Sequence, residues 1–308
     1  MIFFTVFNQV AVLFLLMGVG YALAKFGVLN DAGTSQLSTI LCYIVSPVLI
    51  VFAFQTRFSA SMLHNLLVVA AATGGAILLN ILVGGAVFNK KAIADPDRRN
   101  ILLFASAYSN CGFMGFPLLQ AIAGATGLFY GSAVNGVFSI FVWTHGMTIY
   151  SGKLNRKLAL KAVLNPNVVA VAVGAVLFCC SLTLPGPIYS TVKYIAQLNT
   201  PLSMLVIGAT IRKVPLRSIF SEKLVWFGVA MRNVILPFLV LFLFYAAGLR
   251  GNILLCSLIP MACPVAGVTV IFANLTGKDA SLPSRLMTLS TLASLVTLPL
   301  VITVAMAL

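Results

Sequence analysis

The chain has 308 residues, of which 61% are hydrophobic and only 8% are charged, and its mean hydropathy is +1.09. Soluble globular domains are about 45–50% apolar and about 25% charged, so this composition excludes a soluble fold and indicates a polytopic membrane protein. The formal net charge is +14, but the basic residues follow the loops between apolar runs instead of gathering in one segment. We therefore expect the lipid bilayer as a partner, and no nucleic acid.

Apolar runs of membrane length predict ten spans, because about 20 apolar residues cross the hydrocarbon core as a helix. The runs lie near residues 5–24, 36–56, 65–88, 100–122, 128–150, 166–184, 192–211, 224–247, 252–274 and 286–307. Ala22-Leu23-Ala24 could mark a signal-peptidase site after the first run. No basic residue precedes that run and the run is long, so we interpret it as the first span.

The positions of the basic residues predict the orientation. Of the 19 Lys and Arg residues, 15 fall in odd-numbered loops, 3 fall in even-numbered loops, and Arg232 lies within the eighth span. Short loops rich in these residues stay on the cytoplasmic side of a membrane. We therefore expect a multi-pass protein of the cytoplasmic (inner) membrane with both termini outside.

Weak internal symmetry predicts two halves. Sliding the chain on itself by half its length places Ser46-Pro47 over Thr200-Pro201 and Asn110 over Pro264. These matches predict an all-α fold of two five-helix repeats, residues 1–150 and 166–308, joined by a short cytoplasmic linker, residues 151–165. Because each half has an odd number of spans, the second repeat must be inverted in the membrane.

The fourth and ninth predicted spans each contain proline and glycine near the middle, in SNCGFMGFP (residues 109–117) and CPVAG (residues 263–267). Proline removes a backbone donor and glycine tolerates non-helical conformations, so both helices are predicted to be broken. Broken backbone at membrane depth persists only inside protein or beside a water-filled cavity, and in inverted repeats it marks a transporter's substrate site. The half-helix N-termini would favour an anion. The alternative is a pair of kinked helices that pack tightly without a ligand.

The residues around these breaks are the candidates for the site. The Asn110 amide suits a carboxylate, and Ser109 could add a hydroxyl. The substrate-binding candidates are Ser109, Asn110, Cys111, Gly112, Cys263, Pro264, Val265 and Ala266. The hinge candidates are Gly115, Pro117 and Gly267, and the supporting polar candidates are Asn135, Ser139, His145 and Arg232.

Two of these candidates carry open alternatives. Arg232 could attract the anion, pair within the bundle or snorkel to an interface. His145 could be a structural histidine or a proton relay. We expect no catalytic residue, cofactor or metal site, because two isolated histidines and the spacing of six cysteines supply neither a nucleophile with its base nor a ligand set.

Three runs carry a resemblance to a known family: GYALAKFGVLND, SNCGFMGFPLL, and PVAGVTVIFANLTGKDASLPSRLMTLSTLASLVTLPL. They resemble the auxin efflux carrier family, in the bacterial branch associated with transport of malate, malonate and related acids, and the resemblance covers essentially the whole chain. It implies a fold similar to bile-acid sodium symporters and alternating access of the elevator kind. The scaffold would hold helices 1, 2, 6 and 7, and the transport core helices 3–5 and 8–10.

By the same resemblance the family's crossover asparagine corresponds to Asn110 and its second crossover proline to Pro264. This chain departs from the plant members at Ser109, where they have proline, and in the short stretch between its halves. Auxin itself is therefore a poor guess for the ligand.

The acidic residues bear on energy coupling. All five lie in predicted loops or span ends: Asp31, Asp95, Asp97, Glu222 and Asp279. Coupling through a buried carboxylate is therefore not expected, which leaves uniport, sodium held by carbonyls and asparagine, or a proton carried by histidine. We expect a secondary transporter of a small organic anion, a carboxylate such as malate or malonate. A sodium- or proton-coupled symporter, a non-transporting sensor and a homodimeric state are the alternatives left open.

Overall fold

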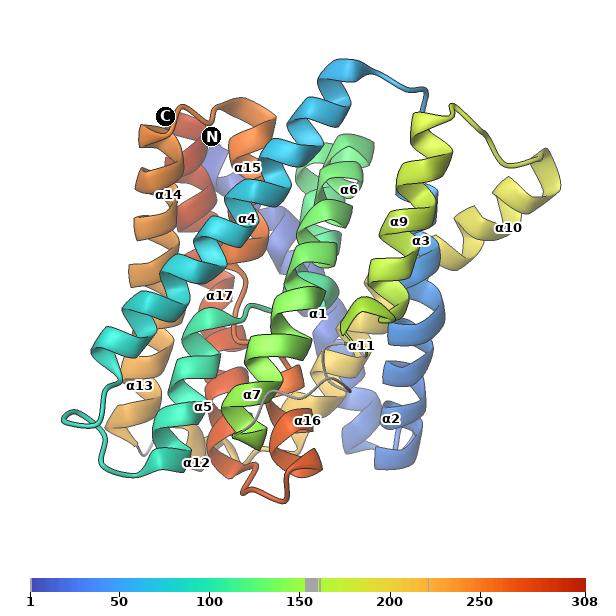
Figure 1. Cartoon of the computed structure of the whole chain (residues 1–308). Helices are drawn as coiled ribbons and strands as arrows, with labels where there is room; N and C mark the ends of the chain where they lie inside the picture. The colour runs from blue at the N-terminus through green and yellow to red at the C-terminus, as the bar shows by residue number, and fades with distance from the viewer. Residues whose placement is uncertain (1, 153–159, 161, 221) are drawn as a thin grey trace.

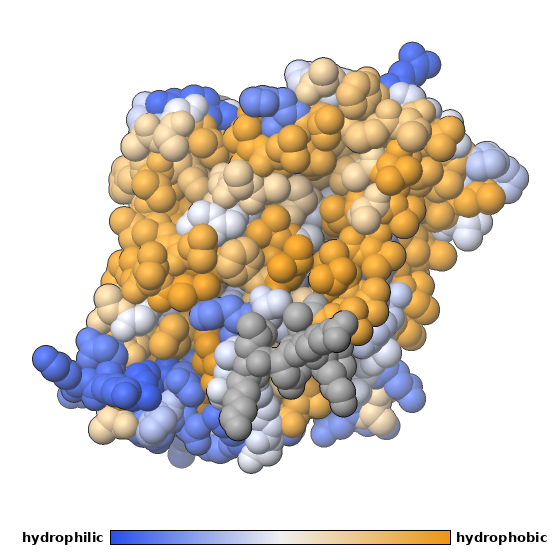
Figure 2. Space-filling view, viewed as in Figure 1, coloured by the Kyte–Doolittle hydropathy of each residue, from blue (hydrophilic) through white to orange (hydrophobic). Residues whose placement is uncertain are grey.

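The computed structural model describes residues 2–152, 160, 162–220 and 222–308 (Figure 1). Over these residues the chain is helical, and the described part contains one isolated antiparallel bridge and no named strand. Figure 2 shows a broad apolar band between ends where the hydrophilic side chains gather. The structure thus confirms an all-α, polytopic membrane protein.

The first half runs to residue 151. Its helices are α1 (Ile2–Lys25), α2 (Asp31–Ile40), α3 (Ser46–Ala53), α4 (Ala60–Val87), α5 (Pro96–Ala107), α6 (Phe116–Phe141) and α7 (Met147–Ser151). Three wider, π-helical turns lie between them: η1 (Leu41–Val45), η2 (Cys111–Gly115) and η3 (Val142–Gly146).

The second half begins at Pro166. Its helices are α9 (Pro166–Cys179), α10 (Gly186–Gln197), α11 (Asn199–Arg212), α12 (Leu216–Phe220), α13 (Lys223–Ala230), α14 (Leu236–Ala246), α15 (Gly251–Ala262), α16 (Val268–Leu275) and α17 (Ser281–Ala307). A fourth π-helical turn, η4 (Met231–Ile235), joins α13 to α14.

Prolines explain three of the π-helical turns. Pro47, Pro117 and Pro237 each stand at the second residue of the helix that follows such a turn. Proline has no N–H, and its ring clashes with the carbonyl four residues earlier, which lies within the preceding turn. Widening that turn relieves the clash without ending the helix.

Seven helical segments of the described chain are long and apolar enough to cross a membrane. They are Phe3–Lys25, Asp31–Ala53, Ala60–Val87, Cys111–Ser151, Gly186–Arg212, Lys223–Ala246 and Ser281–Ala307. Two shorter apolar helices, Pro166–Cys179 and Gly251–Ala262, accompany them. The segment Cys111–Ser151 is not one straight helix, because Gly124 has non-helical dihedral angles of φ 57° and ψ −138°.

Close helix contacts define one group of elements. Helix α1 packs along α11, and α3 packs against α9 and α10. The approach of α1 to α11 is possible because both surfaces carry glycine: a Cβ on Gly208 would stand 1.9 Å from the Met17 carbonyl oxygen, and one on Gly20 would stand 2.3 Å from the Leu205 oxygen. The elements α4, α5, α6, α13, α15 and α17 also pack against one another, and this second group contacts the first through α17 against α1 and through α6 against α9.

One end of the molecule holds a group of ion-paired loops. Both termini lie at one end, while the loops before α5, before α13 and before α17 lie at the other, where Figure 2 shows hydrophilic side chains. There Glu222 accepts a hydrogen bond from Arg98 at 2.8 Å and lies 3.0 Å from Arg285. Most of the predicted linker, residues 151–165, lies outside the described residues, with its basic residues Lys153, Arg156, Lys157 and Lys161.

Candidate functional site: a crossing of two broken helices

The two predicted breaks meet inside the bundle. Helix α5 ends at Ala107 and α15 ends at Ala262, and the extended residues after them run antiparallel with Ser109 opposite Val265. The Asn110 N–H donates to the Pro264 carbonyl at 2.7 Å, and the Ala266 N–H donates to the Tyr108 carbonyl at 3.1 Å. Each break therefore provides hydrogen-bond partners for backbone N–H and C=O groups of the other. Backbone groups at membrane depth need such partners because no water reaches them.

A neighbouring polar group holds the second break. The Val265 N–H donates to the Ser290 hydroxyl at 2.9 Å, and that hydroxyl donates to Asn233 Oδ1 at 2.5 Å. Asn233 Nδ2 in turn donates to the Ser290 carbonyl at 2.8 Å. Asn233 thus fixes the position of α17 against η4, and through Ser290 it fixes the unwound backbone.

Arg232 lies beside the ends of α5 and α15 and is 0% exposed. Its Nε donates to the Cys263 carbonyl at 3.1 Å, its Nη1 donates to the Ser106 carbonyl at 2.9 Å, and its Nη2 donates to the Met261 carbonyl. These carbonyls belong to the C-terminal ends of α5 and α15, where each helix dipole places about half a negative charge. Of the alternatives for Arg232, the structure shows pairing within the bundle.

Several polar side chains at the crossing have no partner among the described residues. Asn110 is 8% exposed and stands at the N-cap of η2, yet its side chain makes no capping hydrogen bond. Asn135 Nδ2 is buried and unpaired in this part of the chain, and the buried Ser109 hydroxyl has only the Cys111 thiol as a neighbouring polar group. Asn135 Nδ2 also lies beside the first turn of η2, 4.0 Å from where a Cβ on Gly112 would be. Buried polar groups without partners are rare in native structures, which makes these groups candidates for ligand contacts.

Asn199 is a candidate that the sequence reasoning missed. It opens α11, is 2% exposed, and has no hydrogen-bond partner on either amide atom among the described residues. Seven residues later, Val206 lies on the same face of the helix and belongs to an apolar cluster against which Phe113 of η2 packs. The available signal was an asparagine in the middle of an apolar span, directly before the Thr200-Pro201 pair of the repeat alignment.

The remaining supporting candidates, Ser139 and His145, lie near the end of α6 and in η3. His145 Nδ1 is 2.8 Å from the Tyr108 hydroxyl, and that hydroxyl donates to the Phe141 carbonyl at 3.0 Å. Because Tyr108 directly precedes Ser109, one side chain connects the histidine to the break. Ser139 is buried at 4% exposure on the same helix as Asn135.

The hinge candidates have helical backbone in this conformation. Gly115 has φ −68° and ψ −47°, and Gly267 has φ −61° and ψ −23°. Neither therefore uses the left-handed region that only glycine enters easily. A Cβ on Gly115 would stand 3.7 Å from the Pro260 backbone, which is ordinary van der Waals contact, so the packing there does not require glycine either. Pro117 lies in the first turn of α6, and the hinge role of all three residues stays a prediction.

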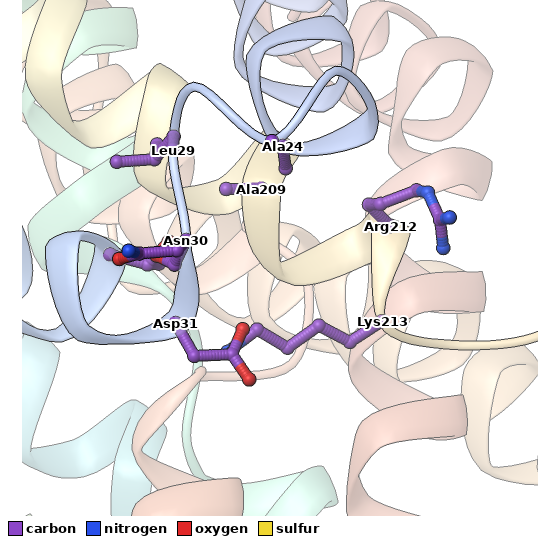
Figure 3. A pocket seen from close by; sticks show the side chains of 9 residues that line it. Ala24, Leu29, Asn30, Asp31, Ala209, Arg212 and Lys213 are labelled. Carbon is purple, nitrogen blue, oxygen red and sulfur yellow. Dashed lines mark hydrogen bonds and ion pairs between the residues drawn. The ribbon is translucent and has the colours of Figure 1, made fainter.

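Most of the crossing is buried in this conformation. Cys111, Cys263, Val265 and Ala266 are at most 4% exposed, and Gly112 is partly exposed. Two surface hollows lie elsewhere. One, of about 160 Å³, is on α10, and the other, of about 340 Å³, lies between the α1–α2 loop and the end of α11 (Figure 3). At the second, Lys213 Nζ reaches Asp31 at 2.8 Å.

The geometry defines a helical membrane protein whose two broken helices cross at an internal polar site, an arrangement typical of secondary transporters. Within the described residues no group of His, Cys, Asp and Glu could hold a metal ion.

Comparison with known proteins gives the family. A family model described as membrane transport protein matches residues 5–157 and 150–302. An uncharacterized transporter of Methanothermobacter thermautotrophicus is 26% identical over 97% of this chain and 98% of its own length. An uncharacterized transporter of Methanocaldococcus jannaschii is 25% identical over 95% of this chain and 96% of its own. A probable auxin efflux carrier component 5c of Oryza sativa subsp. japonica is 30% identical over 39% of this chain and 33% of its own. The chain belongs to this membrane transport family, that of the auxin efflux carriers, and is a transporter and not an enzyme.

Proposed function

We propose that this transporter moves a small organic anion across the cytoplasmic membrane by alternating access, with its site at the crossing of the two broken helices. The observation that carries the proposal is the position of Arg232, which donates to the C-terminal carbonyls of both α5 and α15. The negative ends of the two half-helices are thereby neutralised, and the positive ends are not.

The charges at the crossing favour an anion. Two helix C-termini carry about half a negative charge each, which together match the single positive charge of Arg232. The N-termini of the helix that begins with η2 and of α16 carry about half a positive charge each. The five acidic residues of the chain all lie away from the crossing, in loops or at helix starts, at Asp31, Asp95, Asp97, Glu222 and Asp279. A bound carboxylate would supply the missing negative charge.

Ten crossings in two inverted repeats are the architecture that we propose for this site. In this architecture the turn at Gly124 would divide the segment Cys111–Ser151 into two crossings. Pairing α5 with the part of α6 before that turn, and α15 with α16, gives two interrupted spans in corresponding positions. The location of both termini at the end opposite the ion-paired loops (Figure 1) supports an even number of spans with the termini outside.

We further propose that the substrate binds between a scaffold and a moving core. The contacts of α1 with α11 and of α3 with α9 and α10 support the scaffold, and those among α4, α5, α6, α13, α15 and α17 support the core. Phe113 of η2 meets Leu41, Val45 and Val206 of the proposed scaffold in a small apolar cluster. A carboxylate such as malate or malonate would contact Ser109, Asn110 and Asn135 from the core and Asn199 from the scaffold.

Uptake into proteoliposomes tests this function. Labelled malate, malonate and a monocarboxylate would be offered with membrane potential, sodium and pH gradients imposed one at a time, against liposomes without protein. We expect saturable uptake of an anion that follows the potential. Uptake that needs sodium or a pH gradient would instead establish coupled symport, and binding without uptake of any anion would establish a sensor.

A further inference from the structure

Arg232 is a buried charge with an unusual set of partners. Three of its nitrogens donate to three backbone carbonyls, those of Ser106, Met261 and Cys263, and its side chain is fully buried. These oxygens come from two helices that are far apart in the sequence and that both end at the crossing. A charge in the membrane interior is costly and is kept where it has a function.

Unwound carbonyls at half-helix C-termini are the groups that hold coupling cations in transporters built on broken helices. Here a guanidinium occupies such a group of oxygens and matches its negative charge. We infer that Arg232 is a tethered cation that takes the place of a coupling ion at the crossing. The inference deepens the proposed function, on which it rests, by stating that anion transport takes no inorganic cation with it.

The geometry makes Arg232 a positioning residue. Three of its five N–H donors are engaged with carbonyls, and both α5 and α15 are bonded to the same guanidinium. The adjacent Asn233 holds Val265 through Ser290. Two consecutive residues of η4 thus hold both breaks, and the fixed charge would move with the crossing instead of entering and leaving with the substrate.

Removal of the side chain should therefore create a cation site. In Arg232→Ala the three carbonyls would face a space once filled by a guanidinium, with two helix C-termini left uncompensated. Free guanidinium at millimolar concentration should fit this space best, and sodium should bind more weakly with water completing its shell. In Arg232→Met the space is filled but the charge is missing, so neither cation should help.

Thermal unfolding of the purified full-length protein in nanodiscs tests the inference without any substrate. We expect the wild-type midpoint to be the same in sodium chloride and choline chloride. Arg232→Ala should unfold roughly 10 °C lower in choline chloride, with a saturable recovery on addition of guanidinium or sodium. Arg232→Lys, which keeps the charge, should lie between the two, and Arg232→Met should stay low in every salt.

The matched control is Arg250→Ala. Arg250 also donates to carbonyls at a helix end, those of Tyr245 and Leu249 at 2.6 and 2.7 Å, but it is exposed to solvent. Its loss should cost little and show no specific rescue.

An Arg232→Met protein as stable as the wild type would overturn the inference, because filling the volume would then suffice. Equal effects of sodium and choline on Arg232→Ala, with no guanidinium response, would overturn it as well. If Arg232→Ala is not recovered folded, recovery of the Lys variant but not of the Met variant supports the charge requirement. Failure of the wild type to transport any anion would count against the proposed function alone, since the cation rescue does not depend on substrate.

Discussion

The backbone amide of Asn110 donates a hydrogen bond to the carbonyl of Pro264, 2.7 Å away. The two residues lie in opposite halves of the chain and were matched by the internal alignment. The bond uses only the main chain of Asn110, so its side chain is left free of any structural role in the crossing. A substitution of the Asn110 side chain therefore tests the proposed ligand contact without removing this main-chain bond.

Asn110→Ala should weaken anion binding about tenfold or more while leaving the fold intact. The reason is that alanine keeps the N–H bonded to Pro264 but removes an amide that would donate to the carboxylate, and hydrogen bonds to charged groups are each worth about 1.5–3 kcal/mol. Binding and uptake of labelled anion would be measured with the thermal midpoint. Asn252→Ala, at the exposed start of the second broken helix, is the control. Unchanged binding in a folded Asn110→Ala protein would contradict the proposed site.

Asn199→Leu should stabilise the protein and lower its uptake. Both amide atoms of Asn199 are buried without partners in the described structure, so an apolar side chain of similar size removes a desolvation penalty of about 1–3 kcal/mol. A residue with a structural role would show the opposite change in stability. Thermal unfolding and uptake, measured on the same preparation, distinguish a structural role of Asn199 from a role in binding. A lower midpoint in the leucine variant would show that Asn199 is needed for the fold.

Gly208→Ala should destabilise the protein by about 1–3 kcal/mol or more, because the added methyl would overlap the Met17 backbone of α1. Gly18→Ala is the matched control on the same pair of helices. A Cβ at Gly18 meets nothing within 4 Å, so that substitution should be neutral or mildly stabilising. Equal midpoints for the two variants would mean that α1 and α11 separate more readily than their contact indicates.

Asp279→Ala should lower stability at neutral pH and have little effect in acid. The Ser281 hydroxyl and then its N–H donate to the Asp279 carboxylate, at 2.5 and 2.9 Å, and hold the pKa of this carboxyl below its usual range. A lowered pKa in the folded state stabilises the protein above the ordinary value of about 3.9, and this stabilisation is lost as the pH falls through the folded-state pKa. Midpoints of the wild type and the variant from pH 7 to pH 3 should therefore converge. A constant difference would show that packing, not charge, is what the variant lost.

Much of the fold could be predicted from local features of the sequence. The apolar runs indicated a polytopic helical protein, since length and hydropathy are properties of each segment alone. The breaks at residues 109–117 and 263–267 followed from proline and glycine, whose backbone effects are also local. The turn at Gly124 falls between the predicted fourth and fifth spans for the same kind of reason.

What the sequence by itself determined was thus the class of protein, the helices and the places where two of them break. Only the tertiary structure decided which groups the broken ends meet. Arg232 could have faced an anion, an interface or the bundle, and the choice depended on carbonyls of α5 and α15 that no sequence spacing brings together. The buried, unpaired state of Asn199 likewise depends on tertiary packing, in which α11 contacts η2. Hydrogen bonds and burial between distant segments depend on how whole helices pack, because each partner's availability is set by every other contact in the bundle.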